Sequence, residues 1–189
     1  YGVTVEKKSQ TSPSDTKKKT GTGNFITAYI DHGTSPQNAS YEYLMLVRPS
    51  SKDEGRFAKK LPYTVIQADN QAHVVRDDIT GITAYISYGG YASAETLVAG
   101  AEPETIVMER TRDDGKVVMS VCTPDLGITE KGYTTTQQSQ KILKKVILKG
   151  TWSLSSPSEN VDLIIEDGNT VISAICLHGQ PVEFTLNNH

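Results

Sequence analysis

The sequence predicts an all-β protein, built from antiparallel strands in a β-sandwich architecture with one short helix. From Phe25 onward, short apolar runs rich in β-branched and aromatic residues are separated by Gly, Asn, Asp or Pro, which is typical of antiparallel strands. Several runs alternate apolar and polar residues, as strands with one face on a core do. The 189 residues are enough for one large domain or two small ones.

Eleven segments carry the strand pattern. One of them, 41–47, is apolar on both faces at its middle, so we expect it to be a central strand. Another, 182–186, alternates Val, Phe and Leu with Glu and Thr, which predicts one face on a core and the other in water. The eleven segments are 25–30, 41–47, 63–67, 72–76, 82–87, 105–109, 117–122, 142–148, 161–165, 171–176 and 182–186.

Local signals predict two hairpins and the helix. Asp114-Gly115 and Asp167-Gly168 each lie between apolar runs, and both dipeptides reach positive φ at low cost, which predicts tight hairpins. The capping box Ser51-Lys52-Asp53-Glu54 predicts the start of a helix. We expect this helix over residues 52–60, because the residue before Pro62 disfavours helical geometry.

The remaining segments suggest how the chain divides. Residues 1–22 are rich in Lys, Ser and Thr, and we expect a polar arm or loop. Residues 92–98 are a weak helix candidate, but Ala-Gly-Ala-Glu-Pro at 99–103 is typical of a linker, so we place a domain boundary between residues 98 and 99. The chain begins at Tyr1 with no apolar leader in view, which favours a processed chain or a piece of a larger one.

Composition argues against several classes of protein. No run approaches the roughly 20 apolar residues of a membrane-spanning helix, and the mean hydropathy is −0.38. Nineteen Lys and Arg against 22 Asp and Glu leave a net charge of −3, which gives no electrostatic argument for nucleic acid. No Cys/His cluster has zinc spacing and no glycine-rich phosphate loop occurs, so we expect no metal and no cofactor.

Both cysteines lie in apolar runs, where a small thiol packs as a hydrophobic residue. We therefore expect Cys122 and Cys176 to be buried free thiols. A disulfide between them requires Cα atoms within about 7 Å, and the sequence leaves that alternative open.

Candidate catalytic groups have simpler structural interpretations. Asp31-His32 at a strand end could be an acid–histidine pair, but adjacent strand residues point apart, so we favour a structural turn in which Gly33 bends and Asp31 binds backbone amides. His73 is expected on a solvent-facing strand position. The acid pairs at 77–78, 113–114 and 166–167 fall in predicted turns and match no calcium-loop template.

Lysines are concentrated around residues 141–149. On a strand, Lys141, Lys145 and Lys149 share one face, while Lys144 points to the other. One interpretation is a solubilising edge strand, since lysines protect strand edges from pairing. The alternative is a contact for a sulfated or carboxylated polysaccharide, for which these three lysines are the candidate residues.

Several segments together resemble the chondroitin sulfate ABC lyases of polysaccharide lyase family 8. The longest are Thr27-Ala28-Tyr29-Ile30-Asp31-His32-Gly33 and Ala39-Ser40-Tyr41-Glu42-Tyr43-Leu44. The likeness continues through 63–67, 72–75 and 106–108, and ends on Val121-Cys122-Thr123-Pro124-Asp125-Leu126. With the strand pattern beyond that motif, the resemblance covers about residues 23–186 and indicates the C-terminal portion of such an enzyme.

The resemblance implies a modular secreted or periplasmic bacterial parent that cleaves chondroitin or dermatan sulfate, or hyaluronan, by β-elimination. In that parent, a helical catalytic domain precedes a large β-sandwich and a smaller C-terminal β-sandwich. Residues 23–98 would end the large sandwich and residues 99–189 would form the small one. The family's catalytic residues lie upstream, so no residue of this chain is expected to be catalytic. The expected partners are the upstream catalytic domain and glycosaminoglycan.

Three hypotheses about function remain open at this stage. The first is a non-catalytic β-domain that supports the catalytic domain of a lyase. The second is an independent carbohydrate-binding or adhesin-type module, in which exposed tyrosines such as Tyr88 and Tyr91 stack on sugars. The third is an unrelated structural β-sandwich, which the length of the first two motifs disfavours.

Overall fold

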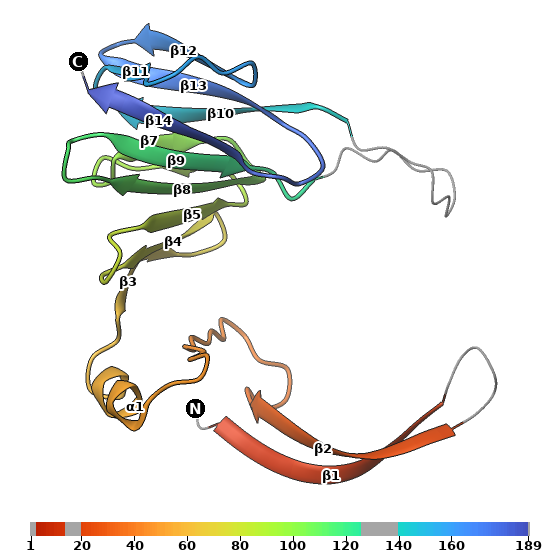
Figure 1. The fold of residues 1–189 in the computed structure, drawn as a ribbon. Helices are drawn as coiled ribbons and strands as arrows, with labels where there is room; N and C mark the ends of the chain where they lie inside the picture. The colour runs from red at the N-terminus through yellow and green to blue at the C-terminus, as the bar shows by residue number, and fades with distance from the viewer. Residues whose placement is uncertain (1–2, 14–19, 126–139, 189) are drawn as a thin grey trace. The chain divides into compact units, whose positions relative to one another are not determined.

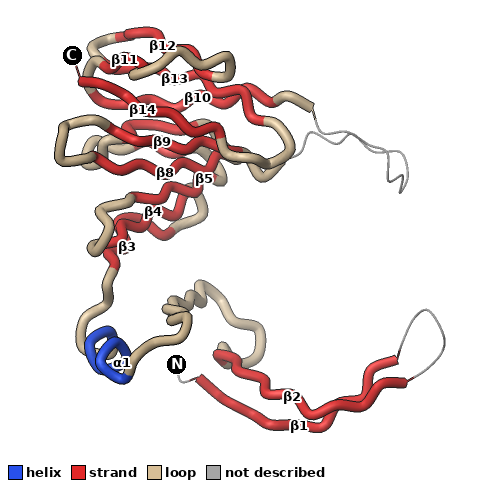
Figure 2. Tube along the Cα trace, viewed as in Figure 1, coloured by secondary structure: helices blue, strands red, loops and turns tan. Residues whose placement is uncertain are grey.

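The computed structural model describes residues 3–13, 20–125 and 140–188. The chain divides into two compact units, Tyr1–Ser50 (unit 1) and Ser51–His189 (unit 2). Strands hold 55% of the residues and the helix 4%, and every pair of named strands is antiparallel. The predicted all-β, antiparallel fold class with one short helix is therefore confirmed (Figures 1 and 2).

Unit 1 contains one two-stranded sheet. Strands β1 (Val3–Pro13) and β2 (Thr20–Ile30) pair along their whole length, with Val3 opposite Ile30. The expectation of a polar arm or loop at residues 1–22 is wrong for β1, because its Thr and Val residues favour extended backbone and β2 offers a complete set of hydrogen-bonding partners. No described side chain of unit 1 is buried.

Residues 41–47, expected to form a central strand, carry no regular secondary structure. Tyr41 and Met45 are 67% and 75% exposed. A strand that is apolar on both faces needs paired neighbours and a layer on each face. In unit 1, β1 and β2 pair only with each other among the described residues, so neither condition is met.

Unit 2 holds the helix and the remaining twelve strands. Its elements are α1 (Ser51–Phe57), β3 (Tyr63–Ala68), β4 (Ala72–Asp77), β5 (Thr83–Ser87), β6 (Tyr91–Ala92), β7 (Val98–Ala101), β8 (Thr105–Thr111), β9 (Val117–Cys122), β10 (Ile142–Lys149), β11 (Trp152–Leu154), β12 (Val161–Glu166), β13 (Asn169–Cys176) and β14 (Val182–Asn188). They form a seven-stranded sheet in the order β11-β14-β9-β8-β5-β4-β3 and a five-stranded sheet in the order β12-β13-β10-β7-β6.

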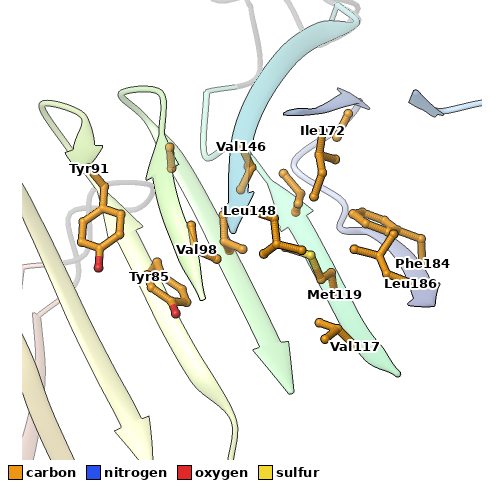
Figure 3. Close-up of a cluster of buried hydrophobic side chains, with 14 of the residues drawn as sticks. Tyr85, Tyr91, Val98, Val117, Met119, Val146, Leu148, Ile172, Phe184 and Leu186 are labelled. Carbon is orange, nitrogen blue, oxygen red and sulfur yellow. The ribbon is translucent and has the colours of Figure 1, made fainter. Parts of the chain in front are cut away.

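Both sheets contribute to a single hydrophobic core (Figure 3). The seven-stranded sheet supplies Met119 and Leu186, and the five-stranded sheet supplies Val146, Leu148 and Ile172. Burying one such aliphatic side chain stabilises the fold by about 1.5–3 kcal/mol. Because side chains from the two sheets meet in one core, unit 2 is a β-sandwich.

The predicted turns are confirmed. Gly115, at φ +78°, follows β8, and its amide donates to the carbonyl of Arg112 at 3.0 Å. Asp167 and Gly168, at φ +49° and +75°, join β12 to β13 in a two-residue hairpin. Helix α1 begins in the predicted capping box, and it ends at Phe57, three residues before the expected end.

The structure also changes the expected division of the chain. The boundary placed between residues 98 and 99 falls inside unit 2, where β5 pairs with β8 across it. The proposed linker and weak helix are corrected to strand β7 and the β6–β7 turn. Small residues suit this position, since a Cβ on Gly100 would lie 3.3 Å from both the Ile147 side chain and the Tyr91 carbonyl oxygen.

Candidate functional site

The lysine-rich segment forms β10, which lies at the centre of the five-stranded sheet. The interpretation of a solubilising edge strand is therefore wrong. Lys141 and Lys145 are exposed, and the Lys149 ammonium group donates to the Ala94 carbonyl oxygen. Lys144 lies on the opposite face, as predicted; it is buried there, and its Nζ donates to the Pro103 carbonyl oxygen at 3.0 Å.

Acidic residues lie in the same cross-strand rows as two of these lysines. Asp162 of β12 is in the row of Ser173 and Lys145, and Glu166 is in the row of Asn169 and Lys149. Two strand spacings separate each acid from its lysine, about 10 Å, which is about one Debye length at 0.1 M salt. The face also exposes Leu143 and Ile147. It therefore carries both signs of charge and apolar side chains, and does not form a continuous cationic stripe.

The Asp31-His32-Gly33 segment forms the expected structural turn. Gly33 has φ +76°, and its amide donates to Asp31 Oδ1 at 2.7 Å. His73 is exposed, as predicted. Its ring packs against the Tyr88 ring in a T-shaped arrangement, with ring centroids 5.3 Å apart.

The acid pair at 77–78 behaves as predicted for a turn. Asp77 accepts from the Ile79 amide at 2.8 Å and from the Thr80 hydroxyl at 2.6 Å, and these bonds lower the pKa of Asp77. Asp78 accepts from Arg76 Nε at 3.0 Å. Among the described residues, no group of three or more His, Cys, Asp or Glu side chains is arranged to hold a metal ion.

A buried carboxyl group that the sequence patterns did not single out lies inside unit 2. Strand register places Arg76 of β4, Thr83 of β5 and Glu109 of β8 in one cross-strand row. This row is on the core-facing side of the sheet, next to the row that contains Tyr85 and Val107. The alternation of Thr105, Val107 and Glu109 could have revealed it, because Glu109 shares its parity with two buried residues.

Glu109 is only 7% exposed. Its Oε1 accepts a hydrogen bond from the Tyr85 hydroxyl at 3.2 Å. Burial raises the pKa of Glu109 above its ordinary value of 4.5, and burial also raises the pKa of Tyr85. The Nε of Arg76 pairs with Asp78 Oδ1 at 3.0 Å.

A cavity of about 330 Å³ opens beside Glu109. Its lining comes from the inner face of β3, β4, β5 and β8, and from the turn between β6 and β7. The lining residues are Ile66, Arg76, Thr83, Tyr85, Glu95, Thr96, Leu97 and Glu109. The volume is at the lower end of the roughly 300–1,000 Å³ typical of small-molecule pockets.

The two tyrosines suggested for sugar stacking differ in their environment. Tyr91 is only 5% exposed, packs at 5.4 Å against Tyr85, and shares a 2.6 Å hydrogen bond with the Thr96 hydroxyl. Its proposed role as an exposed stacking residue is therefore wrong; Figure 3 shows it inside the core cluster with Tyr85. Tyr88 is 49% exposed and remains available at the surface.

Unit 1 carries an apolar groove of its own, with a volume of about 540 Å³. Tyr41 and Tyr43 stack there with ring centroids 6.1 Å apart and an interplanar angle of 16°. The lining residues are Val3, Ala28, Tyr29, Ile30, His32, Tyr41, Tyr43 and Met45. Such a surface on a two-stranded sheet without a core is suited to being covered by further polypeptide.

Both cysteines are free thiols. Cys176 is fully buried, as expected, whereas Cys122 is half-buried. Burial raises the pKa of each thiol, which disfavours the reactive thiolate. In the described part of the chain, no helix has the length and apolar character needed to span a membrane.

Solved structures identify the class of protein that shares this fold. The chain aligns with the Streptomyces coelicolor A3 chondroitin AC lyase, solved in complex with chondroitin sulphate, with a TM-score of 0.68 and 15% identity over 99% of this chain and 24% of that one. It aligns with a Paenibacillus xanthan lyase with a TM-score of 0.70 and 17% identity, over 99% of this chain and 18% of that one. The fold is thus one found within polysaccharide lyases.

Sequence comparison identifies a more specific group of similar enzymes within the polysaccharide lyases. The chain is 27% identical over 190 residues to the chondroitin sulfate ABC endolyase of Proteus vulgaris, and 28% identical over 197 residues to a chondroitin sulfate ABC exolyase of Bacteroides thetaiotaomicron. These alignments cover 98% and 91% of this chain, but only 18% and 19% of the relatives' lengths. No protein-family model matches the chain. The resemblance to chondroitin sulfate ABC lyases is confirmed, and the chain spans about a fifth of such an enzyme.

Proposed function

We propose that this chain is a non-catalytic C-terminal β-domain segment of a secreted bacterial glycosaminoglycan lyase. One observation carries the proposal: nearly the whole chain matches chondroitin sulfate ABC lyases, yet it spans less than a fifth of their length. The parent enzyme acts on chondroitin or dermatan sulfate by β-elimination, and this segment supports its catalytic domain.

The difference in burial between the two units favours a structural role for this chain in a larger enzyme. Unit 2 has a complete core, as an autonomous β-sandwich requires. Unit 1 exposes apolar side chains on a hairpin and on the segment that follows it, and isolated two-stranded sheets are marginal in water. In this proposal, unit 1 ends the larger sandwich of the parent, whose other strands cover it, and unit 2 is the small C-terminal sandwich.

The described residues also favour a non-catalytic segment. β-Elimination requires a base for the proton next to the carboxylate, a group that stabilises the developing charge, and an acid for the leaving oxygen. The acid of the Asp31-His32-Gly33 turn serves a local bend, since Asp31 accepts from the Gly33 amide. Glu109 faces a cavity with no histidine in its lining. In this proposal, elimination is carried out by the rest of the parent enzyme.

The enzymatic part of the proposal is tested by incubating the 189-residue chain with chondroitin sulfate and following the ultraviolet absorbance of the unsaturated uronate product. We expect no rise above a blank that lacks protein. A complete chondroitin sulfate ABC lyase, assayed in the same buffer, is the positive control. A protein-dependent rise that persists after repurification would overturn the non-catalytic assignment.

In this proposal Lys141, which precedes β10, and Lys145 and Lys149 of β10 keep a subsidiary role as a polyanion contact. The neighbouring acids Asp162 and Glu166 predict that any such contact is weak. The affinity for chondroitin sulfate oligosaccharides should therefore fall steeply as the salt concentration rises. The variant Lys145→Gln should bind these oligosaccharides more weakly than the unsubstituted chain. Saturable binding that is insensitive to salt would instead support an independent carbohydrate-binding module.

A further inference from the structure

We propose that the outer face of the seven-stranded sheet in unit 2 is an interface with another part of the parent lyase chain. The identity of the occupant rests on the proposed function, whereas the surface itself is assigned from strand register and exposure. The surface, called here the apolar face, is made of two neighbouring cross-strand rows on β3, β4, β5 and β8, which lie side by side in Figure 1. Its residues are Val65, Val75, Ala84, Met108, Ile86 and Ile106.

Strand register brings these residues together. In the first row, Val75 of β4 is opposite Ala84 of β5, and Ala84 is opposite Met108 of β8. In the second row, Ile86 of β5 is opposite Ile106 of β8. Buried, core-facing residues alternate with them along β5 and β8, so both rows point away from the core.

The sequence of these strands is that of strands covered on both sides. A strand with one face in water normally alternates apolar and polar residues. Strands β5 and β8 instead contain the continuous apolar runs 84–86 and 106–108. The core of unit 2 covers only one face of each strand, and Met108 on the other face stays 42% exposed. The pattern therefore indicates a further layer of polypeptide on the outer side of this sheet.

The outer face of the five-stranded sheet has a different composition. There, Lys145 of β10 and Asp162 of β12 lie in one row, and Lys149 and Glu166 lie in another. Among the described strand residues of the apolar face, neither row contains Asp, Glu, Lys or Arg between β3 and β9. Charged residues lie around the two rows, at Asp77, Arg110 and Glu183. An apolar centre with a charged rim is typical of a stable protein interface.

The rest of the parent chain is the occupant that fits this composition. The chain spans less than a fifth of the chondroitin sulfate ABC lyases that it matches, so most of such an enzyme is polypeptide outside this chain. A glycosaminoglycan does not fit, because a polyanion requires cationic groups and the two rows have none. An apolar surface of the same polypeptide gains free energy from burying these side chains, and the covalent link keeps it close by.

Hydroxyl-radical footprinting, read by mass spectrometry, compares the 189-residue chain with the complete polypeptide that its gene encodes. Exposed methionine is oxidised to the sulfoxide. In the 189-residue chain, Met108 should be oxidised, whereas Met119, which is 1% exposed, should be protected. In the complete polypeptide, oxidation of Met108 should fall about fivefold or more, because the interface excludes solvent. Ile164, 49% exposed on the outer face of the five-stranded sheet, is the control and should be modified equally in both proteins.

A matched pair of substitutions tests the same interface through stability. Met108→Lys places a charge within the apolar face, and Ile164→Lys places one at a similarly exposed position of the other sheet. In the complete polypeptide, Met108→Lys should lower the midpoint of thermal unfolding by about 5 °C or more, because the buried ammonium group has no partner there. The same change in the 189-residue chain, and Ile164→Lys in either protein, should shift the midpoint by less than about 2 °C.

Met45 of unit 1, which is 75% exposed, separates this inference from the proposed function. The proposed function has parent polypeptide covering unit 1, so it predicts protection of Met45 in the complete polypeptide. Protection of Met45 without protection of Met108 would support the proposed function and overturn the interface at the apolar face. Protection of neither methionine would contradict both proposals.

Two further results would overturn the interface. Equal protection of Ile164 and Met108 would show that coverage is not specific to the apolar face. Protection of Met108 that increases with the concentration of the 189-residue chain would identify a second copy as the occupant. These outcomes are read on unsubstituted proteins, so they hold even if the Met108→Lys polypeptide does not fold.

Discussion

Units 1 and 2 are both built from antiparallel strands with β-branched and aromatic residues, but only unit 2 buries them. In unit 1, Ile26 of β2 is 74% exposed, and no described side chain is buried. In unit 2, Leu148 of β10 is inaccessible to solvent. The comparison shows that strand propensity produces paired strands in both units, whereas stability depends on the second layer that only unit 2 supplies.

This difference assigns separate roles to the two units. Unit 2 has a core that can offset the conformational entropy of its own folding. Unit 1 has a hairpin, a groove and exposed apolar side chains, which are features of one side of an interface. The predictions below alter matched positions in the two units, and Trp152, the only tryptophan, reports on unit 2 through its fluorescence.

The largest expected effect is a cavity in the core of unit 2. Leu148→Ala should lower the free energy of unfolding by about 2–5 kcal/mol, because it removes buried atoms and leaves space that the two sheets cannot fill. The matched change Ile26→Ala should alter it by less than about 0.5 kcal/mol. Urea unfolding followed by far-ultraviolet circular dichroism, to which the strands of both units contribute, measures both variants, and equal losses at the two positions would contradict the comparison.

A smaller effect is expected at a turn. Gly168 has φ +75°, so Gly168→Ala should cost about 1–2 kcal/mol of unit 2 stability. Gly168→Asn should recover part of this loss, because Asn tolerates the left-handed region. Gly21, in β2, has no neighbouring atom within 4 Å of an added Cβ, and Gly21→Ala should leave the Trp152 unfolding curve unchanged. A neutral Gly168→Ala would show that the hairpin adopts another turn.

The third prediction concerns the pH dependence of stability. Because burial raises the pKa of Glu109, the folded state binds this proton more tightly than the unfolded state. Stability should therefore fall as the pH rises from the ordinary Glu pKa of 4.5 through the raised pKa of the folded state.

Glu109→Gln should remove this part of the slope, measured as the urea midpoint of Trp152 fluorescence against pH. In unit 1, Glu6 provides the control, since its hydrogen bond with Lys8 lowers its pKa. Glu6→Gln should leave the Trp152 profile unchanged. A slope that survives in Glu109→Gln would show that another group is responsible.

Much of unit 2 is predictable from sequence. The Asp-Gly dipeptides at 114–115 and 167–168 identify their hairpins because only a few residue types reach positive φ at low cost. Alternation likewise places Lys144 and Lys145 on opposite faces of the sheet. These features depend on neighbours that are close along the chain.

The errors occur where the outcome depends on distant partners. Residues 41–47 have the pattern of a central strand, but they have no paired neighbours in unit 1. Strand β7 was missed because Ala99 and Gly100 have low strand propensity, and their small size is explained only by the close approach of β6 and β10. The cavity was missed because a polar residue in a strand is usually exposed, and strand register alone brings Glu109 beside Thr83.

We propose that unit 2 folds by itself, whereas unit 1 depends on further polypeptide of a parent lyase. Amide hydrogen exchange of the 189-residue chain, followed by mass spectrometry, distinguishes the two units. We predict strong protection in β5, β8, β9, β10 and β13, and near-intrinsic exchange in β1 and β2. Protection of β1 and β2 equal to that of β10 would instead show that unit 1 is stable without a second layer.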